Sequence, residues 1–187
     1  GQSAVSLRGV RVLHHERVCL QGDALLPLDL WQRWPDVNFA HLLNDGTVSR
    51  VHLEATELDL RTVSRLTGVD WPLGGTLTGT VNAEGPLGAL KLDGTMQLAH
   101  GILPLDWKGG AVREVSAQIT LEGNAIRVEQ GIGRYVNGDF GIAGRLDLAK
   151  PRAPSLEAVG SGTYQSQPFT FSVKGDAIKP LITTEGH

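Results

Sequence analysis

Histidines are the residues of this chain best suited to hold a metal ion, and it has six of them. His14 and His15 are adjacent, in a segment whose alternating apolar residues predict a β-strand. Because successive side chains of a strand point to opposite faces, these two rings cannot easily share one ion. His41, His52 and His100 have no partner at a spacing typical of metal ligands. We therefore expect no metal site.

The sequence also lacks the residue patterns that catalysis requires. The chain has no Gly-x-Ser-x-Gly sequence, and its single cysteine, Cys19, has no evident base. Asp139–Phe140–Gly141 matches the magnesium-binding tripeptide of protein kinases, but no glycine-rich loop or catalytic-loop sequence accompanies it. A glycosidase would need converging carboxylates, whereas the candidates are predicted to lie scattered over turns: Glu114, Glu122, Glu129 and Asp139. We expect no catalytic residues, no cofactor and no enzymatic activity.

Composition argues against further classes of function. The net charge is −3 and no basic stripe is present, so nucleic acid is not an expected partner. No apolar run approaches the roughly 18 residues of a membrane-spanning helix. Glycine is abundant, at 24 of 187 residues, whereas aromatic residues make up only 5%. The glycines separate apolar runs at turn-like intervals, which is typical of a chain rich in strands.

The clearest strand pattern lies between Gly75 and Gly101, where two alternating runs flank a glycine–proline turn. This period of two predicts strands with one apolar and one polar face. In the first run the apolar-face residues are Leu77, Gly79, Val81 and Ala83. In the second run they are Leu90, Leu92, Met96 and Leu98.

Similar runs recur at roughly 8–12-residue spacing, which predicts an all-β sandwich, barrel or solenoid. Val18 and Leu20 are expected on one apolar face, and Gly9 at a β-bulge. Short helices are expected near residues 36–44 and 59–66. Further along, we expect a brief strand at 102–106, a glycine-rich crossing at 131–138, and final strands at 155–162, 163–175 and 177–183. The expected organisation is one continuous domain, with an N-terminal β region over 1–56 carrying a helical plug near 36–44, followed by β repeats over 57–187.

A sheet with one apolar face must cover that face, and two arrangements satisfy this requirement. The apolar rows can pack against one another in a closed core. Alternatively, rows of Leu, Val, Ile and Ala can line a trough for a long aliphatic chain, since each buried methylene contributes about 0.8 kcal/mol. Periodicity alone leaves both arrangements open.

Several segments resemble the repeating unit of the TamB and AsmA-like family of envelope proteins. That unit is an alternating strand, a turn, then L-x-G-x-L-x-L and a closing glycine. The segments that carry the resemblance are Gly79–Gly101, Val115–Val128, Gly138–Leu148, Leu58–Leu66 and Val173–Thr183, within residues 53–183. One departure is that the family often has proline where Leu90 stands, whereas the proline here is Pro86.

The resemblance implies a β-taco, which is an elongated, folded-over, antiparallel-type sheet with a hydrophobic groove and one or two short helices. It implies a piece from the C-terminal region of a TamB-type protein that lies in the periplasm, anchored in the inner membrane by a segment outside this chain. The implied partners are phospholipid acyl chains, an outer-membrane barrel of the TamA type and client β-strands. The implied activity is phospholipid transport between the membranes, or assistance to outer-membrane protein assembly. The implied groove-facing residues are Leu77, Val81, Leu90, Leu92, Met96, Leu98, Val115, Ile119, Leu121, Phe140, Ile142, Leu146 and Leu148.

Two other functions are compatible with a glycine-rich β chain. One is a structural β-solenoid or sandwich from a secreted adhesin, whose interior is fully packed. The other is a carbohydrate-active β-helix enzyme, which would need several carboxylates on one exposed face. A row of tryptophans on one side of the sheet would favour sugar binding.

Overall fold

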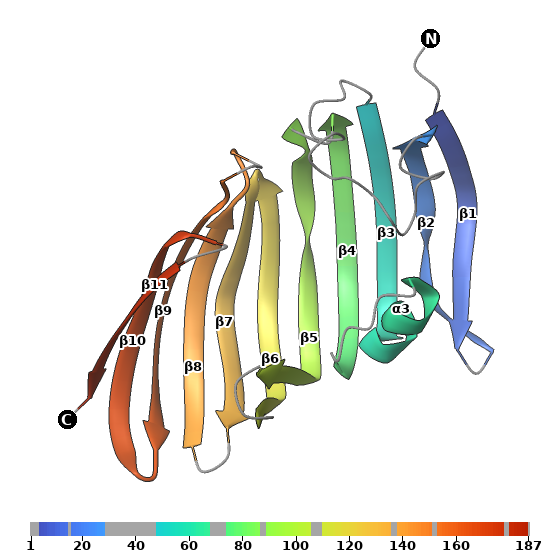
Figure 1. The fold of residues 1–187 in the computed structure, drawn as a ribbon. Helices are drawn as coiled ribbons and strands as arrows, with labels where there is room; N and C mark the ends of the chain where they lie inside the picture. The colour runs from blue at the N-terminus through green and yellow to red at the C-terminus, as the bar shows by residue number, and fades with distance from the viewer. Residues whose placement is uncertain are drawn as a thin grey trace.

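The computed structural model describes residues 4–14, 16–28, 48–67, 74–86, 89–105, 110–135, 138–150, 153–177 and 180–186. These residues form eleven strands in a single antiparallel sheet, and the order of strands in space is their order in the sequence (Figure 1). The predicted all-β, elongated antiparallel fold is therefore confirmed. The strands are β1 (Ala4–His14), β2 (Arg17–Pro27), β3 (Val48–Asp59), β4 (Gly74–Pro86), β5 (Lys91–Leu105), β6 (Gly110–Gly123), β7 (Ala125–Tyr135), β8 (Gly138–Asp147), β9 (Ser155–Tyr164), β10 (Gln167–Asp176) and β11 (Pro180–Gly186).

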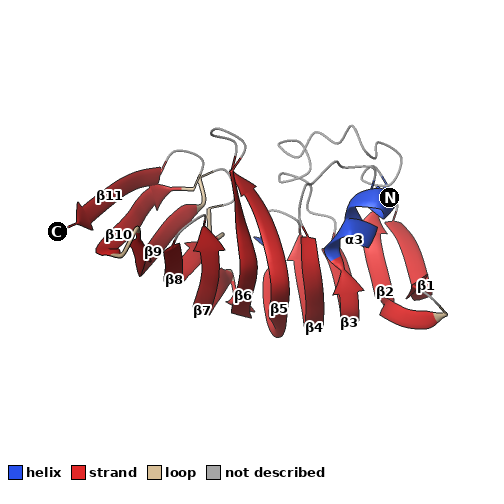
Figure 2. Cartoon of the chain, turned by 90° about the horizontal axis from the view of Figure 1, so that it is seen from below, coloured by secondary structure: helices blue, strands red, loops and turns tan. Residues whose placement is uncertain are grey.

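One described helix, α3 (Leu60–Thr67), lies against a single face of the sheet near β3 and β4 (Figure 2). Asp59 begins it, because the Asp59 carboxylate accepts a hydrogen bond of 2.9 Å from the Arg61 backbone N–H. Val63 packs against a small buried cluster that includes Ala55 and Leu58. The helix expected over residues 59–66 is confirmed, and it covers part of the apolar face.

Replacing Asp59 with alanine removes the side-chain acceptor at the start of α3. We expect a loss of about 1 kcal/mol in the free energy of unfolding, since this is the usual cost of losing such a cap. Urea denaturation followed by circular dichroism measures the change. Asp59→Asn is the control, because the amide oxygen can still accept the bond; equal destabilisation by both variants would contradict a capping role.

Two glycines allow β4 and β5 to approach closely. A Cβ on Gly79 would lie 2.1 Å from the Thr95 carbonyl oxygen, and one on Gly94 would lie 2.1 Å from the Thr80 carbonyl oxygen. Their φ angles, 143° and 144°, are also ones that other residues rarely adopt. Glycine is therefore required at both positions by the geometry of the strand pair.

Several strands are longer than the sequence predicts. The brief strand expected at 102–106 is the end of β5, which continues through Gly101 as a 15-residue strand. The crossing expected at 131–138 is wrong, since Gly131 and Gly133 pair within β7 with Ile142 and Phe140. The expected break between residues 162 and 163 is also wrong, because the turn lies between Tyr164 and Gln167.

Bulges change which residues share a face in β1 and β2. The pairing of these strands shifts between Leu7 and Val10, which confirms the bulge expected at Gly9. A second shift follows because Val12 pairs with Leu20 whereas Leu13 pairs with Val18, leaving Cys19 as the extra residue. The expectation that Val18 and Leu20 share a face is therefore wrong, since the inserted residue reverses the alternation.

The helical plug expected near residues 36–44 lies outside the described residues. The boundary expected at residue 56 falls inside β3, which pairs with β2 on one side and β4 on the other.

Candidate functional site

An unbroken row of apolar residues and glycines crosses all eleven strands. Each member is the paired partner of the next, so the row runs perpendicular to the strands. It contains no polar side chain. From β1 to β11 the row is Val12, Leu20, Ala55, Gly79, Met96, Ile119, Val128, Gly144, Ala158, Val173 and Ile182.

A second row runs beside the first, two residues away along each strand, from β1 to β10. It is also free of polar side chains. Its members are Val10, Gly22, Leu53, Val81, Gly94, Leu121, Ile126, Leu146, Leu156 and Gly175. We call the face that carries these two rows the trough.

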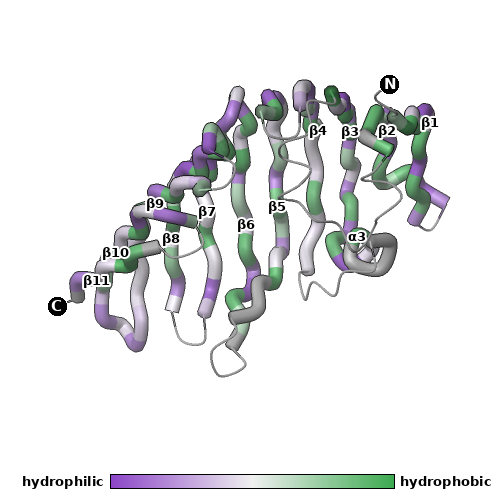
Figure 3. The backbone as a smooth tube through the Cα atoms, turned by 45° about the horizontal axis from the view of Figure 1, so that its top comes forward, coloured by the Kyte–Doolittle hydropathy of each residue, from purple (hydrophilic) through white to green (hydrophobic). Residues whose placement is uncertain are grey.

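Most trough residues are only half-buried, unlike the residues of a closed core. Met96, Ile119, Val128 and Leu146 all keep part of their surface accessible. Among the described elements, α3 is the one that packs onto this face, beside Leu58 and Leu77. Over β5 to β11, no described element packs on the trough, and the hydropathy of each strand alternates along the chain (Figure 3).

The length of the trough follows from the strand spacing. Neighbouring strands lie about 4.8 Å apart, so a row across eleven strands measures about 48 Å along the sheet. A fatty acyl chain spans half of a bilayer hydrocarbon core, or about 15 Å. The rows are therefore long enough to contact several acyl chains placed end to end.

The opposite face of the sheet is polar and carries exposed ion pairs. Arg50 lies 2.5 Å from Glu84, and Lys174 lies 3.0 Å from Glu157. The Arg50 guanidinium lowers the pKa of Glu84, through its hydrogen bond first and its charge second. Exposed pairs of this kind contribute little stability, but they keep this face compatible with water.

Removal of the Arg50 charge tests this pairing. An ion pair that lowers a carboxylate pKa stabilises the folded state. This stabilisation is complete above the ordinary glutamate pKa of about 4.3, and it is lost as the pH falls through the lowered pKa of the folded state. We therefore expect Arg50→Gln to raise the Glu84 pKa toward its ordinary value in a carbon-detected NMR titration. The urea midpoint at pH 7 should fall only slightly, because both side chains are exposed and water screens the pair. An unaltered Glu84 titration in the variant would disprove the pairing in solution.

The carboxylates singled out in the sequence lie in strands rather than in turns, so that expectation is wrong. Glu114 and Asp139 both contact Arg134, each at 3.0 Å. Their shared cation neutralises them, and Glu129 instead accepts a hydrogen bond of 2.9 Å from the Thr120 hydroxyl. The four tryptophans lie outside the described residues.

No cluster of His, Cys, Asp and Glu suited to a metal ion occurs in the described part of the chain. His52 Nδ1 lies 2.5 Å from the Asn82 side-chain oxygen on the polar face. His15 and His41 lie outside the described residues.

The trough brings most of the predicted groove residues together. Leu98 and Ile142 lie in a third, parallel row with Leu77, and Phe140 lies beyond them near the hairpin ends of the strands. Val115 is buried beside Gly101. Leu90 and Leu148 differ from the others because they lie just outside β5 and β8, so pairing does not fix the face on which they lie. Five predicted residues lie in the two rows that define the trough: Val81, Met96, Ile119, Leu121 and Leu146. Leu92 lies on the same face, where it pairs with Ala83.

Several trough residues were absent from the predicted set. These residues alternate in the same phase as their neighbours, so their periodicity could have identified them. They are Val10, Val12, Leu20, Leu53, Ile126, Val128, Leu156, Phe171 and Val173.

No described helix is both long enough and apolar enough to cross a membrane. Comparison of the chain with known protein families, with curated proteins and with solved structures found no match.

Proposed function

We propose that this chain binds the acyl chains of phospholipids along its trough and lets them move across the strands. The observation that carries the proposal is the pair of apolar rows, which cross ten and eleven strands without a polar side chain. A continuous apolar surface of this size normally marks a binding surface. Its elongated form fits an aliphatic chain better than a compact ligand.

The open form of the trough fits a carrier. About ten methylenes that bury half of their surface against it would gain about 4 kcal/mol, at about 0.8 kcal/mol for each fully buried methylene. A free energy of that size corresponds to a dissociation constant of about 1 mM before any ordering cost. Lipid held in this way can be released without a large barrier, as transport requires.

The proposed setting is the periplasm, in a protein that is anchored in the inner membrane by another segment. The resemblance of Gly79–Gly101 and Val115–Val128 to the TamB and AsmA-like repeat supports this setting. The trough would then be one section of a path for phospholipid toward the outer membrane, with a barrel of the TamA type as the partner there.

A second candidate function, the binding of client β-strands, is favoured by the edges of the sheet. β1 and β11 each pair with one described strand only. On β11, Leu181 and Ile182 are 71% and 57% exposed. An extended segment of an unfolded barrel protein can add to such an edge through backbone hydrogen bonds. Crosslinking from a photoreactive residue at position 182 to added barrel-strand peptides would test this function, and the absence of crosslinks would contradict it.

Vesicle transfer tests the lipid proposal. Donor vesicles carry a fluorescent phospholipid with a quencher, acceptor vesicles carry neither, and the protein is added in catalytic amount. We expect fluorescence to recover faster with the protein than without it, in proportion to protein concentration. A recovery rate equal to the spontaneous rate would contradict the carrier function.

A further inference from the structure

The aromatic residues are concentrated at one end of the trough. Both tyrosines and three of the four phenylalanines of the chain lie in β7 to β10: Tyr135, Tyr164, Phe140, Phe169 and Phe171. Elsewhere the described trough is aliphatic. The ligand environment therefore changes along its length.

Tyr135 and Tyr164 flank a glycine at the hairpin ends of their strands. Tyr135 pairs with Gly138, and a Cβ on Gly138 would lie 3.2 Å from the Tyr164 Cα. The same Cβ would lie 1.8 Å from the Thr163 carbonyl oxygen, so glycine is required where β8 begins between the two tyrosines. The backbones of the two tyrosines are separated by two strand spacings, or about 9.6 Å.

Phenylalanines alternate with glycines in the neighbouring row. Phe140 pairs with Gly133 on one side and with Gly162 on the other, and Gly162 pairs with Phe169. Phe169 and Phe171 are stacked, with ring centroids 6.1 Å apart. The tyrosines are thus continuous with an apolar aromatic surface that leads into the trough.

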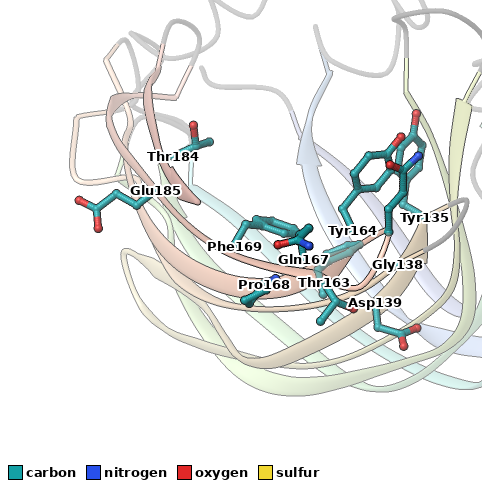
Figure 4. Close-up of a pocket in the computed structure, with 12 residues that line it drawn as sticks. Tyr135, Gly138, Asp139, Thr163, Tyr164, Gln167, Pro168, Phe169, Thr184 and Glu185 are labelled. Atoms are coloured by element: carbon teal, nitrogen blue, oxygen red, sulfur yellow. The ribbon is translucent and has the colours of Figure 1, made fainter. Parts of the chain in front are cut away.

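Tyr135, Tyr164, Phe140 and Phe169 are among the residues that line a pocket of about 480 Å³, which has no cationic lining residue among those described. Its charged lining residues are Asp139 and Glu185. Asp139 is already paired with Arg134, at 3.0 Å. In Figure 4 Tyr135, Tyr164 and Phe169 project from the concave side of the bowed strands, whereas Asp139 projects from the convex side.

This chemistry favours a cation over an anion. The faces of aromatic rings attract ammonium groups within about 6 Å of the ring centroid. Tyr135 and Tyr164 project from the same side of the sheet and belong to the strands that flank β8, so a group bound above β8 can contact both rings. An anionic headgroup would meet ring faces here, and no described lining residue that could neutralise it.

We infer that the tyrosine end of the trough holds the ammonium of an ethanolamine-bearing phospholipid between Tyr135 and Tyr164, while its acyl chains extend over Phe140 and Phe169. The inference rests on the proposed function, because it assigns the headgroup of the lipid whose chains occupy the trough. The phosphate stays at the open rim, near Gln167, where water can solvate it.

Competitive uptake tests the inference. The full chain is incubated with vesicles of equal phosphatidylethanolamine and phosphatidylglycerol that share the same acyl chains, then recovered and analysed by lipid mass spectrometry. We expect the bound fraction to be enriched in the ethanolamine lipid by roughly two- to fivefold, which is the range for an exposed cation–π contact. Tyr164→Leu should remove the enrichment and keep total uptake, whereas Tyr164→Phe should keep both because the ring face remains.

The outcomes separate the two proposals. Uptake without headgroup preference, or a preference that survives the Tyr135→Leu/Tyr164→Leu double variant, would overturn the headgroup assignment and leave acyl-chain binding intact. No uptake of either lipid by the wild-type chain would overturn acyl-chain binding, and the headgroup assignment with it. Circular dichroism of each variant confirms that the sheet is folded.

Discussion

Replacing Ile119 with aspartate is expected to reduce phospholipid uptake by at least tenfold. Ile119 lies in β6 at the middle of the longer row, paired with Met96 on one side and Val128 on the other. An acyl chain that follows the row must pass over this position. A carboxylate there would have to lose water for the lipid to bind, and even 1.4 kcal/mol of that cost gives a factor of ten.

The sheet itself offers a matched control for this change. Ile132 is on β7 and is 51% exposed. It pairs with Gly141 and Ser116 on the face opposite the trough. Ile132→Asp makes the same substitution in the same sheet, and we expect it to leave uptake unchanged. Uptake is measured with radiolabelled phospholipid in vesicles, alongside the unfolding midpoint of each variant. Equal uptake by the two aspartate variants would show that the trough face is not where lipid binds.

Replacing Gly79 with alanine is expected to cost at least about 3 kcal/mol in the free energy of unfolding. The new Cβ would meet the Thr95 carbonyl oxygen at 2.1 Å, far inside any real contact distance. The backbone φ of 143° adds strain for a residue other than glycine. Because β4 and β5 lie in the middle of the sheet, they would have to separate to accept one methyl group.

Gly141→Ala is the control for that change. A Cβ at Gly141 would find its nearest neighbour, the Gly131 carbonyl oxygen, at an ordinary contact distance of 3.7 Å. We expect it to change the free energy of unfolding by less than about 1 kcal/mol. Urea denaturation of both variants gives the comparison. Similar midpoints for the two would contradict the close approach of β4 and β5 at Gly79.

The amphipathic alternation predicted the class of fold well because it depends on local sequence alone. Met96 and Leu98 are inside strand β5, where each second residue faces the trough. The register between distant strands was not readable from the sequence, since it depends on backbone pairing. Only the structure shows that Met96 pairs with Gly79 and Ile119. The continuous rows follow from such pairings.

Bulges and glycines explain where the sequence prediction was wrong. Cys19 is inserted between the pairing of Val12 and that of Leu13, which reverses the face of Val18. The sequence pattern around Gly131 and Gly133 predicts a break between strands, but these glycines lie within β7 and provide space for Ile142 and Phe140, whose side-chain atoms lie beside the missing Cβ positions. A glycine that makes room for a neighbouring side chain has the same sequence signature as a glycine in a turn. The aromatic pocket at Tyr135 and Tyr164 could not be predicted for a related reason, because strands β7 to β11 must pair to assemble it.

Native mass spectrometry of the chain purified from bacteria, with lipid extraction in parallel, tests acyl-chain binding in the trough most directly. We predict adducts with the masses of phospholipids on the wild-type chain, strongly reduced on Ile119→Asp and retained on Ile132→Asp. A wild-type chain that carries no lipid after purification, and acquires none from vesicles, would contradict lipid binding. The chain would then act as a structural spacer or as a binder of client strands.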